Sequence, residues 1–409
     1  MSTATLQIEK KKTLVPQLRF QEFDGEWKNR SMRDFTKINQ DSKFQFQKDS
    51  MKNRMIIVFI LPMNFLRKDS AKSYFIKNPS ASVICYEDDI LMTRTGNTGQ
   101  VVTGVHGAFH NNFFKIKYDE TCDKWFLYFF LTSHKTQHTI LKLAGASTIP
   151  DLNHGDFYKI TLNIPTFPEQ QKIASFLSAV DEKIQQLSRK KELLEQYKKG
   201  VMQQLFSGEL RFKDENGKDY ADWEEKKLGE VAKFYKGKGM SKSEISEDGK
   251  NECIRYGELY TRYGEVIQDV FSKTNFDINK AVVSQANDVI IPASGETQID
   301  IATASCVMKS GVILGGDLNI IRTNNNGVFL SYYLNSARKL DIANLAQGIS
   351  VVHLYSSQLA LLNLNLPTLP EQQKIANFLS SIDVKIESTN QQINQTQSFK
   401  KGLLQQMFV

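Results

Sequence analysis

The stretch PTFPEQQKIA at residues 165–174 returns as PTLPEQQKIA at residues 367–376. The match continues without a gap from residues 165–206 to residues 367–408, at a constant offset of 202 residues, and 21 of the 42 aligned positions are identical. The segments before the two copies, residues 17–164 and 213–366, are similar in length but align only in scattered places. The sequence therefore predicts a tandem duplication in which one shared frame carries two different heads.

Each copy of the repeat has the pattern of one long helix. Thr166 with Glu169, and Thr368 with Glu371, fit the S/T-x-x-E capping box that begins a helix. Downstream, apolar residues return at alternating intervals of four and three, which is the period of a coiled coil. The seam positions are Ile173, Leu177, Val180, Ile184, Leu187, Lys191, Leu194, Lys198, Val201 and Leu205 in the first helix, and Ile375, Leu379, Ile382, Ile386, Thr389, Ile393, Thr396, Lys400, Leu403 and Met407 in the second.

The chain order of head, helix, head, helix constrains how the helices pair. About 40 residues at about 1.5 Å each make a helix about 60 Å long. The first helix is expected to end near Gly208, because glycine readily adopts the left-handed conformation of a helix cap. Only a short polar linker, residues 211–221, leads into the second head. Parallel pairing would require a long linker to bring the second head back, whereas antiparallel pairing works with this short one. The chain order therefore favours two heads at opposite ends of an antiparallel rod.

The heads have the pattern of mixed structure. Strand-like stretches occur at residues 82–86, 101–102, 112–116, 289–291 and 318–321, and helical stretches at 124–133, 137–143 and 329–340. Weaker sequence similarity between residues 89–96 and 288–295 indicates that the heads share a fold. The predicted fold class is α+β: two mixed α/β heads joined by two long antiparallel coiled-coil helices, in a pseudo-twofold tandem repeat. The expected segments are an N-terminal tail (1–16), a first head (17–165), a first helix (166–208), a second head (209–367) and a second helix (368–409).

Composition sets the broad class of protein. A chain of 409 residues with 41% hydrophobic residues has room for two or three folded domains. The net charge of +7 suits a polyanionic partner, although many proteins without one are mildly basic. The start lacks the apolar core of a signal peptide, and the apolar run at residues 55–66 is too short to span a membrane and contains Pro62. We therefore expect a soluble, cytoplasmic protein with no membrane partner.

A search for catalytic or metal-binding motifs finds no convincing one. The four cysteines stand far apart, without a Cys-x-x-Cys pair, and are expected to be reduced and buried. Residues 237–243 lack the Gly-Lys-Ser/Thr order of a phosphate-binding loop, and no methyltransferase motif of the Asn-Pro-Pro-Tyr type occurs. His134 and His138 could share a metal on a helix, but an exposed pair is the simpler interpretation. The sequence predicts no catalytic residue and no metal site.

Glycine-bearing loops with small polar and basic residues are the best candidates for contact with a polyanionic partner such as DNA. Arginine can bind guanine, asparagine can bind adenine, and lysine or backbone amides can bind phosphate. Tight turns with solvated side chains are the alternative interpretation, and an aromatic and basic cluster at residues 235 and 255–263 is a second candidate surface. The predicted DNA-binding residues are Arg94, Thr95, Asn97 and Thr98 in the first head, and Lys236, Lys238, Ser294, Glu296 and Thr297 in the second.

Polar residues that recur at the 202-residue offset predict a docking surface on the helices. An exposed helical face would explain any one of them, but two copies of one surface suit two copies of one partner. The predicted docking residues are Lys172, Asp181, Lys183, Gln203 and Gln204, with Lys374, Asp383, Lys385, Gln405 and Gln406 as their repeats.

The repeated PEQQKIA start, the KKGxxQQ end of each helix and DILMTRTG at residues 89–96 resemble one family closely. This chain resembles the DNA specificity subunits of type I restriction-modification systems over nearly its whole length. The resemblance implies a non-catalytic reader whose heads are target recognition domains for the two halves of a bipartite site in double-stranded DNA. It also implies two modification subunits, which carry the adenine methyltransferase, and restriction subunits for cleavage. No cofactor is expected on this chain, and S-adenosylmethionine, ATP and Mg are expected on the partner subunits.

Two other functions remain open from the sequence. A self-sufficient nuclease or methyltransferase would need a catalytic pocket. A coiled-coil scaffold whose heads bind proteins would show little dependence of binding on salt, whereas phosphate contacts make DNA affinity fall steeply with salt.

Overall fold

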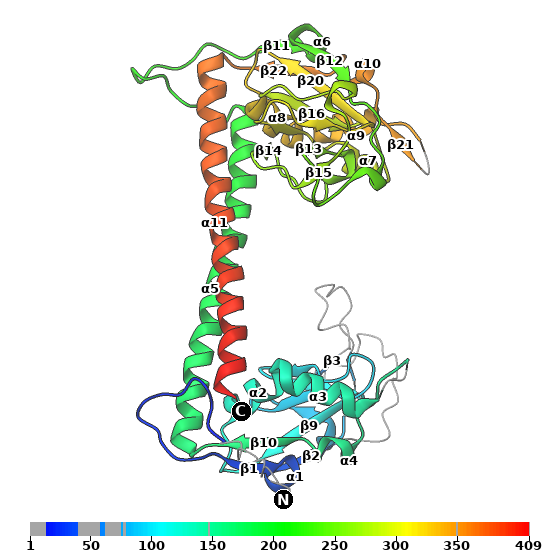
Figure 1. The fold of residues 1–409 in the computed structure, drawn as a ribbon. Coiled ribbons are helices and arrows are strands. Elements are labelled where there is room, and N and C mark those ends of the chain that lie inside the picture. Colours follow the sequence, from blue (N-terminus) through cyan, green and yellow to red (C-terminus); the bar gives the residue numbers. More distant parts are fainter. Residues whose placement is uncertain are drawn as a thin grey trace, which may run out of the picture. The chain divides into compact units, whose positions relative to one another are not determined.

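The computed structural model describes residues 14–39, 58–61, 75–76, 79–145, 148–348 and 351–408 (Figure 1). The chain divides into two compact units, residues 1–187 with 391–409 and residues 188–390. Each unit therefore contains one head, the beginning of one long helix and the end of the other. This division passes through the middle of both helices, whereas the segments expected from the sequence separate whole helices from heads.

The two long helices lie where the sequence predicts them. Helix α5 covers Phe167–Ser207 and α11 covers Leu369–Met407. Every predicted seam position on both helices is buried or partly buried, which confirms the coiled-coil period. Gly208, with φ of 80°, has the left-handed conformation expected after the end of α5.

Within each unit the two helices run antiparallel. In the first unit, Ile173 and Leu177 near the start of α5 share a core with Leu403 and Met407 near the end of α11. The second unit joins the opposite ends, because its core contains Val201 and Leu205 of α5 together with Ile375 and Leu379 of α11. The predicted antiparallel pairing is thus confirmed inside each unit.

The glutamates at the helix starts do not close the expected capping boxes. Glu169 is 1% exposed, and its carboxylate accepts hydrogen bonds from Arg19 and from the indole of Trp27. Glu371 is fully buried and accepts two hydrogen bonds from Arg211. The capping-box interpretation is therefore wrong for these side chains, because a buried carboxylate is stabilised far more by a guanidinium than by a helix-start amide.

The first head contains two four-stranded sheets and a strand pair. The main sheet has the order β2-β9-β6-β7 and is antiparallel throughout, the second has the order β4-β3-β8-β5, and β1 pairs with β10. The strands are β1 (Lys28–Ser31), β2 (Thr36–Asn39), β3 (Val58–Leu61), β4 (Phe75–Ile76), β5 (Ile84–Cys85), β6 (Ile90–Thr93), β7 (Val101–Val102), β8 (Gly107–Phe109), β9 (Phe113–Tyr118) and β10 (Thr161–Ile164). The helices are α1 (Met32–Phe35), α2 (Lys124–Thr132), α3 (His134–Ala144) and α4 (His154–Phe157), with a 3-10 turn at Ala81–Val83.

The second head repeats this plan with additional strands, β14 at the edge of the main sheet and the pair β17-β21. Its main sheet has the order β12-β20-β16-β18-β14, a three-stranded sheet has the order β15-β13-β19, and β11 pairs with β22 as β17 pairs with β21. The strands are β11 (Glu224–Lys227), β12 (Ala232–Lys236), β13 (Asn251–Ile254), β14 (Val266–Ile267), β15 (Ser272–Thr274), β16 (Asp288–Pro292), β17 (Ser294–Gly295), β18 (Ser305–Val307), β19 (Ile313–Leu314), β20 (Leu318–Thr323), β21 (Val352–His353) and β22 (Asn363–Leu366). The helices are α6 (Leu228–Val231), α7 (Gln298–Ile301), α8 (Gly327–Ser336), α9 (Lys339–Leu345) and α10 (Ser356–Leu359), with 3-10 turns at Lys242–Glu244, Tyr256–Glu258 and Ile278–Lys280.

The two heads share a fold, as the sequence predicts. The antiparallel order β2-β9-β6-β7 matches β12-β20-β16-β18, and each head begins with a strand pair followed by a one-turn helix. The predicted helix at residues 329–340 is instead two helices, α8 and α9, which break at residues 337 and 338. The stretch at residues 82–86 is a 3-10 turn followed by the short strand β5.

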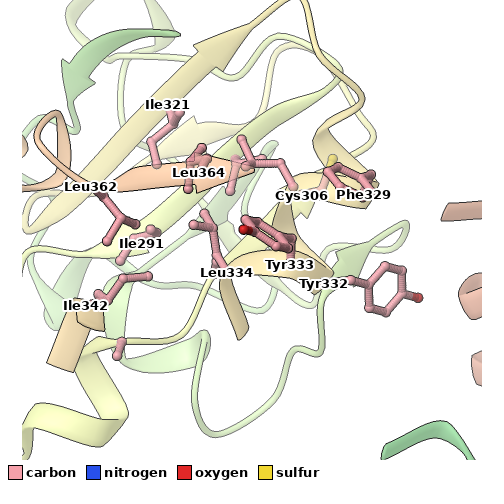
Figure 2. Packing of buried hydrophobic residues seen from close by; sticks show 14 of the residues in the cluster. Ile291, Cys306, Ile321, Phe329, Tyr332, Tyr333, Leu334, Ile342, Leu362 and Leu364 are labelled. Atoms are coloured by element: carbon pink, nitrogen blue, oxygen red, sulfur yellow. The ribbon is translucent and has the colours of Figure 1, made fainter. Parts of the chain in front are cut away.

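The core of the second head forms between its main sheet and α8. Ile291 and Ile321 from the sheet meet Phe329 and Tyr333 from α8, all at most 1% exposed (Figure 2). Tyr332 on the same helix points away from this cluster in Figure 2, and its hydroxyl donates a hydrogen bond to Asp383 of α11. The head is thus attached to its long helix by both apolar and polar contacts.

Candidate nucleic-acid interface and partner surface

In the first head the predicted DNA-binding loop follows strand β6. The guanidinium of Arg94 binds the carboxylate of Asp151 through Nε at 3.0 Å and Nη2 at 2.7 Å. Its Cζ atom lies 5.6 Å from the ring centre of Phe114. Hydrogen bonding from Arg94 lowers the pKa of Asp151 below its usual value. Arg94 is therefore held in a fixed orientation by its two hydrogen bonds to Asp151.

The other three residues of this loop have different environments. Thr95 is partly buried and donates a hydrogen bond to Asp151 at 2.6 Å. Thr98 is 4% exposed and donates to the carbonyl oxygens of Arg94 and Pro150, so its hydroxyl holds the loop together. Asn97 is exposed at the tip. Among these residues, Asn97 is the side chain best placed to meet a ligand.

In the second head, Lys236 and Lys238 are exposed on either side of Gly237. A Cβ atom on Gly237 would lie 1.9 Å from the carbonyl oxygen of Gly315. The amide of Gly237 donates to the carbonyl oxygen of Leu318 at 2.9 Å. The backbone is thereby held against the turn between β19 and β20, and the two lysines project from a fixed loop.

The same turn contacts the second predicted loop of this head. The amide of Lys238 donates to the carbonyl oxygen of Leu314, and the amide of Ala293 donates to that of Asp317. The loops at residues 236–238 and 293–297 therefore both contact this turn, as expected if both loops belong to one DNA-binding surface. Ser294 is 6% exposed within β17, Thr297 caps α7 by accepting from the amide of Asp300, and Glu296 is exposed.

The alternative aromatic and basic cluster is mostly structural. Tyr256, Tyr260 and Tyr263 are partly buried, and Tyr263 stacks on Phe271 with ring centres 5.4 Å apart. Tyr235 is separate from them, 42% exposed on β12, with the guanidinium of Arg322 4.7 Å from its ring centre. A hydrogen-bonded pair with buried Asp288 raises the pKa of Arg322 above its usual value. Tyr235 and Arg322 thus lie on the face of the sheet opposite to Lys236, because successive side chains of a strand point to opposite faces.

Four of the ten predicted docking residues have partners inside their own unit. Lys172 pairs with Glu22 at 3.1 Å, and Lys374 donates to the carbonyl oxygen of Lys213 at 2.8 Å. Asp181 binds Lys400 at 2.6 Å, and Asp383 binds Lys198 at 2.7 Å. The other six are exposed: Lys183, Gln203, Gln204, Lys385, Gln405 and Gln406.

Two further pairs of residues recur at the 202-residue offset on the long helices. Tyr197 is 53% exposed and its repeat Phe399 is 55% exposed, although both lie on long helices. Gly200 and Gly402 stand within the same helices, and a Cβ atom on either would meet nothing within 4 Å. A helix-interior glycine costs about 1 kcal/mol relative to alanine. The offset of 202 residues, applied to positions off the seam, could have revealed both pairs from the sequence.

A charged cluster joins α5, α11 and the second head. Lys198 binds Glu265 at 2.9 Å as well as Asp383, and its Nζ lies 5.0 Å from the ring centre of Tyr332. Burial alone would lower the pKa of Lys198, but the two carboxylates raise it above its usual value. A cavity of about 480 Å³ opens beside this cluster, lined in part by Gln203 and Asn335.

Other chemistry is sparse in the described part of the chain. There, no three His, Cys, Asp or Glu side chains gather in a way that could hold a metal ion. All four cysteines are free and buried, as predicted. Burial raises the pKa of Cys85 and Cys253 to about 11 and that of Cys122 and Cys306 to about 12. Among the helices described, none is long and apolar enough to cross a membrane.

Comparison with known sequences identifies a family. The family described as "Type I restriction modification DNA specificity domain" matches residues 24–196 and again residues 220–397. The MjaVIII specificity subunit of a type I restriction enzyme from Methanocaldococcus jannaschii is 28% identical over 362 residues, covering 84% of this chain and 83% of that protein. The MjaIX specificity subunit of the same organism is 24% identical over 329 residues, covering 77% and 75%.

Solved structures share the fold. The crystal structure of a type I restriction-modification S subunit from M. genitalium matches with a TM-score of 0.61 at 17% identity, covering 97% of this chain and 99% of that one. A chain from a study of complex assembly and conformational transition of the type I restriction-modification system matches with a TM-score of 0.54 at 15% identity, covering 92% and 96%.

Proposed function

Because this chain belongs to the type I restriction modification DNA specificity family and is a non-catalytic specificity subunit, we propose that each of its heads reads one half of a bipartite, asymmetric site in double-stranded DNA. The observation that carries this proposal is the repeat of one fold with divergent loops. The long helices would then set the number of unread base pairs between the half-sites. The separation of the heads along the helices, and the segment boundaries at 165, 208 and 367, are part of this proposal.

The candidate DNA-contacting residues are those of the loops that each head presents. For the first head we assign base or phosphate contact to Arg94, Thr95 and Asn97, with Thr98 as a support of the loop. For the second head we assign it to Lys236, Lys238 and Glu296, with Ser294 and Thr297 as supports. Exposed lysines on a fixed backbone suit phosphate contact, whereas a bidentate arginine or an asparagine suits contact with bases.

The partners in this proposal are two modification subunits, which dock on the repeated helix surfaces, and restriction subunits, which join for cleavage. Exposed aromatics at Tyr197 and Phe399 support the docking surface, because aromatic residues are enriched in interfaces. Gly200 and Gly402 would allow a partner backbone to approach closely. S-adenosylmethionine, ATP and Mg would bind to the partners, and the complex would act in the cytoplasm, where its DNA lies.

Genome-wide detection of modified adenines tests the proposal. Cells that carry the modification partner would be compared with and without this chain. A chain-dependent bipartite motif with a fixed gap is the expected result, and it would name both half-sites. Absence of any such motif from a folded, assembled complex would contradict the proposal. Salt titration of DNA binding separates the scaffold alternative, because phosphate contacts make log affinity fall linearly with log salt.

A further inference from the structure

One buried glutamine makes three hydrogen bonds where the first head meets α5. Gln170 is fully buried. Its Oε1 accepts from the amide of Asp123 at 2.8 Å, and its Nε2 donates to the carbonyl oxygens of Thr121 at 3.0 Å and Pro165 at 3.1 Å. Asp123 is the residue that caps the start of α2. The side chain therefore joins the long helix, the chain leaving β10 and the start of α2.

Gln372 repeats this arrangement in the second head. It is 1% exposed, its Oε1 accepts from the amide of Asn326 at 3.0 Å, and its Nε2 donates to Asn325 Oδ1 and to the carbonyl oxygen of Pro367, both at 2.9 Å. Asn326 caps the start of α8, the counterpart of α2. Both glutamines therefore bond to the cap residue of a head helix, to a residue just before that cap and to the proline before the long helix, although the sequences around Asp123 and Asn326 differ.

The glutamate before each glutamine adds a second connection. Glu169 binds Arg19 through both carboxylate oxygens at 2.8 Å, and Glu371 binds Arg211 at 3.1 Å and 2.8 Å. Each arginine also donates to backbone carbonyls of its own segment. The buried hydrogen bonds of Gln170 and Gln372 require set distances and angles between head and helix, whereas apolar contacts tolerate sliding. The junction between head and helix is thereby restricted to a single geometry.

We propose that Gln170 and Gln372 are positioning residues that fix the direction in which each head leaves its helix, and so fix the gap length that the protein accepts between half-sites. This inference rests on the proposed function. Successive base pairs are about 3.4 Å apart, and about 10 base pairs make one turn. A gap longer by one base pair thus requires a head to move about 3.4 Å and to rotate with the groove. A shift of this size would break the hydrogen bonds of Gln170 and Gln372, because a hydrogen bond does not form when donor and acceptor are more than about 3.5 Å apart.

The test measures gap selection by the whole chain with its modification partner. Plasmids would carry the two half-sites of the wild-type motif at the native gap and at gaps one base pair shorter and longer. We expect Gln170→Ala and Gln372→Ala, each alone, to raise methylation at the altered gaps about tenfold relative to the native gap, which corresponds to about 1.4 kcal/mol of lost discrimination. Gln170→Glu is the second variant, because it keeps an acceptor for Asp123 and the shape of the side chain while removing both donors.

The matched control is Ile116→Val, which trims a buried side chain of β9 and leaves the hydrogen bonds of Gln170 and Glu169 in place. We expect this control to change methylation at the three gap lengths by the same factor. If the glutamine variants also change all gaps by one factor, these residues only stabilise the heads and the inference is wrong. If the wild-type chain accepts all three gaps equally, the proposed function fails and the inference falls with it.

Discussion

The amide of Leu18 donates a hydrogen bond to the carbonyl oxygen of Gln406, 3.0 Å away at the end of α11. The amide of Leu210 donates in the same way to the carbonyl oxygen of Gln204 at the end of α5, also at 3.0 Å. In the second unit, Leu210 stands three residues after the end of α5, so this hydrogen bond joins consecutive parts of the chain. We call the segment before each head its arm: it contains Leu18 in the first unit and Leu210 in the second. The arm of the first unit comes from the N-terminal part of the sequence, so it follows the end of α11 in space as though the chain were closed.

This closure predicts that a circular permutant folds and functions. The new chain would join Val409 to Met1 and begin at Gly217, in the exposed turn at residues 214–218. The cut opens the turn at residues 214–218, where the amide of Asp214 donates to the carbonyl oxygen of Lys218, but it keeps the Leu18–Gln406 and Leu210–Gln204 hydrogen bonds. We expect thermal unfolding within a few degrees of the natural chain, and methylation of the same motif. A permutant that folds yet fails to assemble with its partner would contradict the equivalence of the two arms.

The seam predicts a sharp contrast in stability between substitutions on it and substitutions elsewhere on the same helices. Leu177 and Leu379 are fully buried, whereas Leu193 is 47% exposed. Leu177→Asp or Leu379→Asp would bury an unpaired charge, and we expect a loss of several kcal/mol in the free energy of unfolding. Leu193→Asp is the control and should change it by less than about 0.5 kcal/mol. Urea unfolding followed by circular dichroism would measure both.

The two inter-helix ion pairs should differ in strength. Lys198 has a side chain 13% exposed between two carboxylates, whereas Lys400, 21% exposed, has Asp181 as its carboxylate partner. Lys198→Met leaves two partly buried carboxylates without their cation, and we expect a loss of about 3 kcal/mol. Lys400→Met should cost about 1 kcal/mol. Equal shifts in the urea midpoint would show that Glu265 adds nothing to the cluster.

Arg94 predicts a local change in specificity. If its guanidinium reads a base, Arg94→Ala should relax recognition at one position of one half-site by about 1–3 kcal/mol, or roughly 5- to 150-fold, and leave the other half-site intact. Sequencing of methylated sites from a randomised library would measure this. Uniform loss across all sequences would instead assign Arg94 to phosphate contact, or to the support of the loop through Asp151.

The buried thiols predict a pH dependence. Because the pKa values of Cys122 and Cys306 are raised to about 12, these thiols keep their protons in the folded state while unfolded thiols lose theirs near pH 9. Their contribution to stability is therefore complete below about pH 8.5 and is lost as the pH rises toward 12. Thiol labelling at pH 8 should be slow in the native protein and should reach four groups after unfolding in urea. Cys306→Ala should reduce the loss of stability at high pH, and fast native labelling of the wild type would contradict the buried assignment.

The positions of the long helices could be read from the sequence because their signal is local. Leu177 and Leu379 stand at coiled-coil spacing in a repeat with a constant offset, and periodic apolar residues suffice to define a helix and its buried face. The same reasoning located strands β9, β16 and β20, whose patterns alternate or are continuously apolar. The break between α8 and α9 had no comparable signal.

What only the tertiary structure decided are contacts between residues far apart in the chain. Glu169 fits a capping box by its neighbours, yet its carboxylate binds Arg19, 150 residues earlier. Arg94 stands in a loop typical of DNA contact, and Asp151, 57 residues later, holds it in place. The sequence by itself determined the repeat, the helices and the family resemblance, because these depend on order and period along the chain. The partners of buried charges and amides depend on which distant segments meet, and that is settled only when the heads fold against their helices.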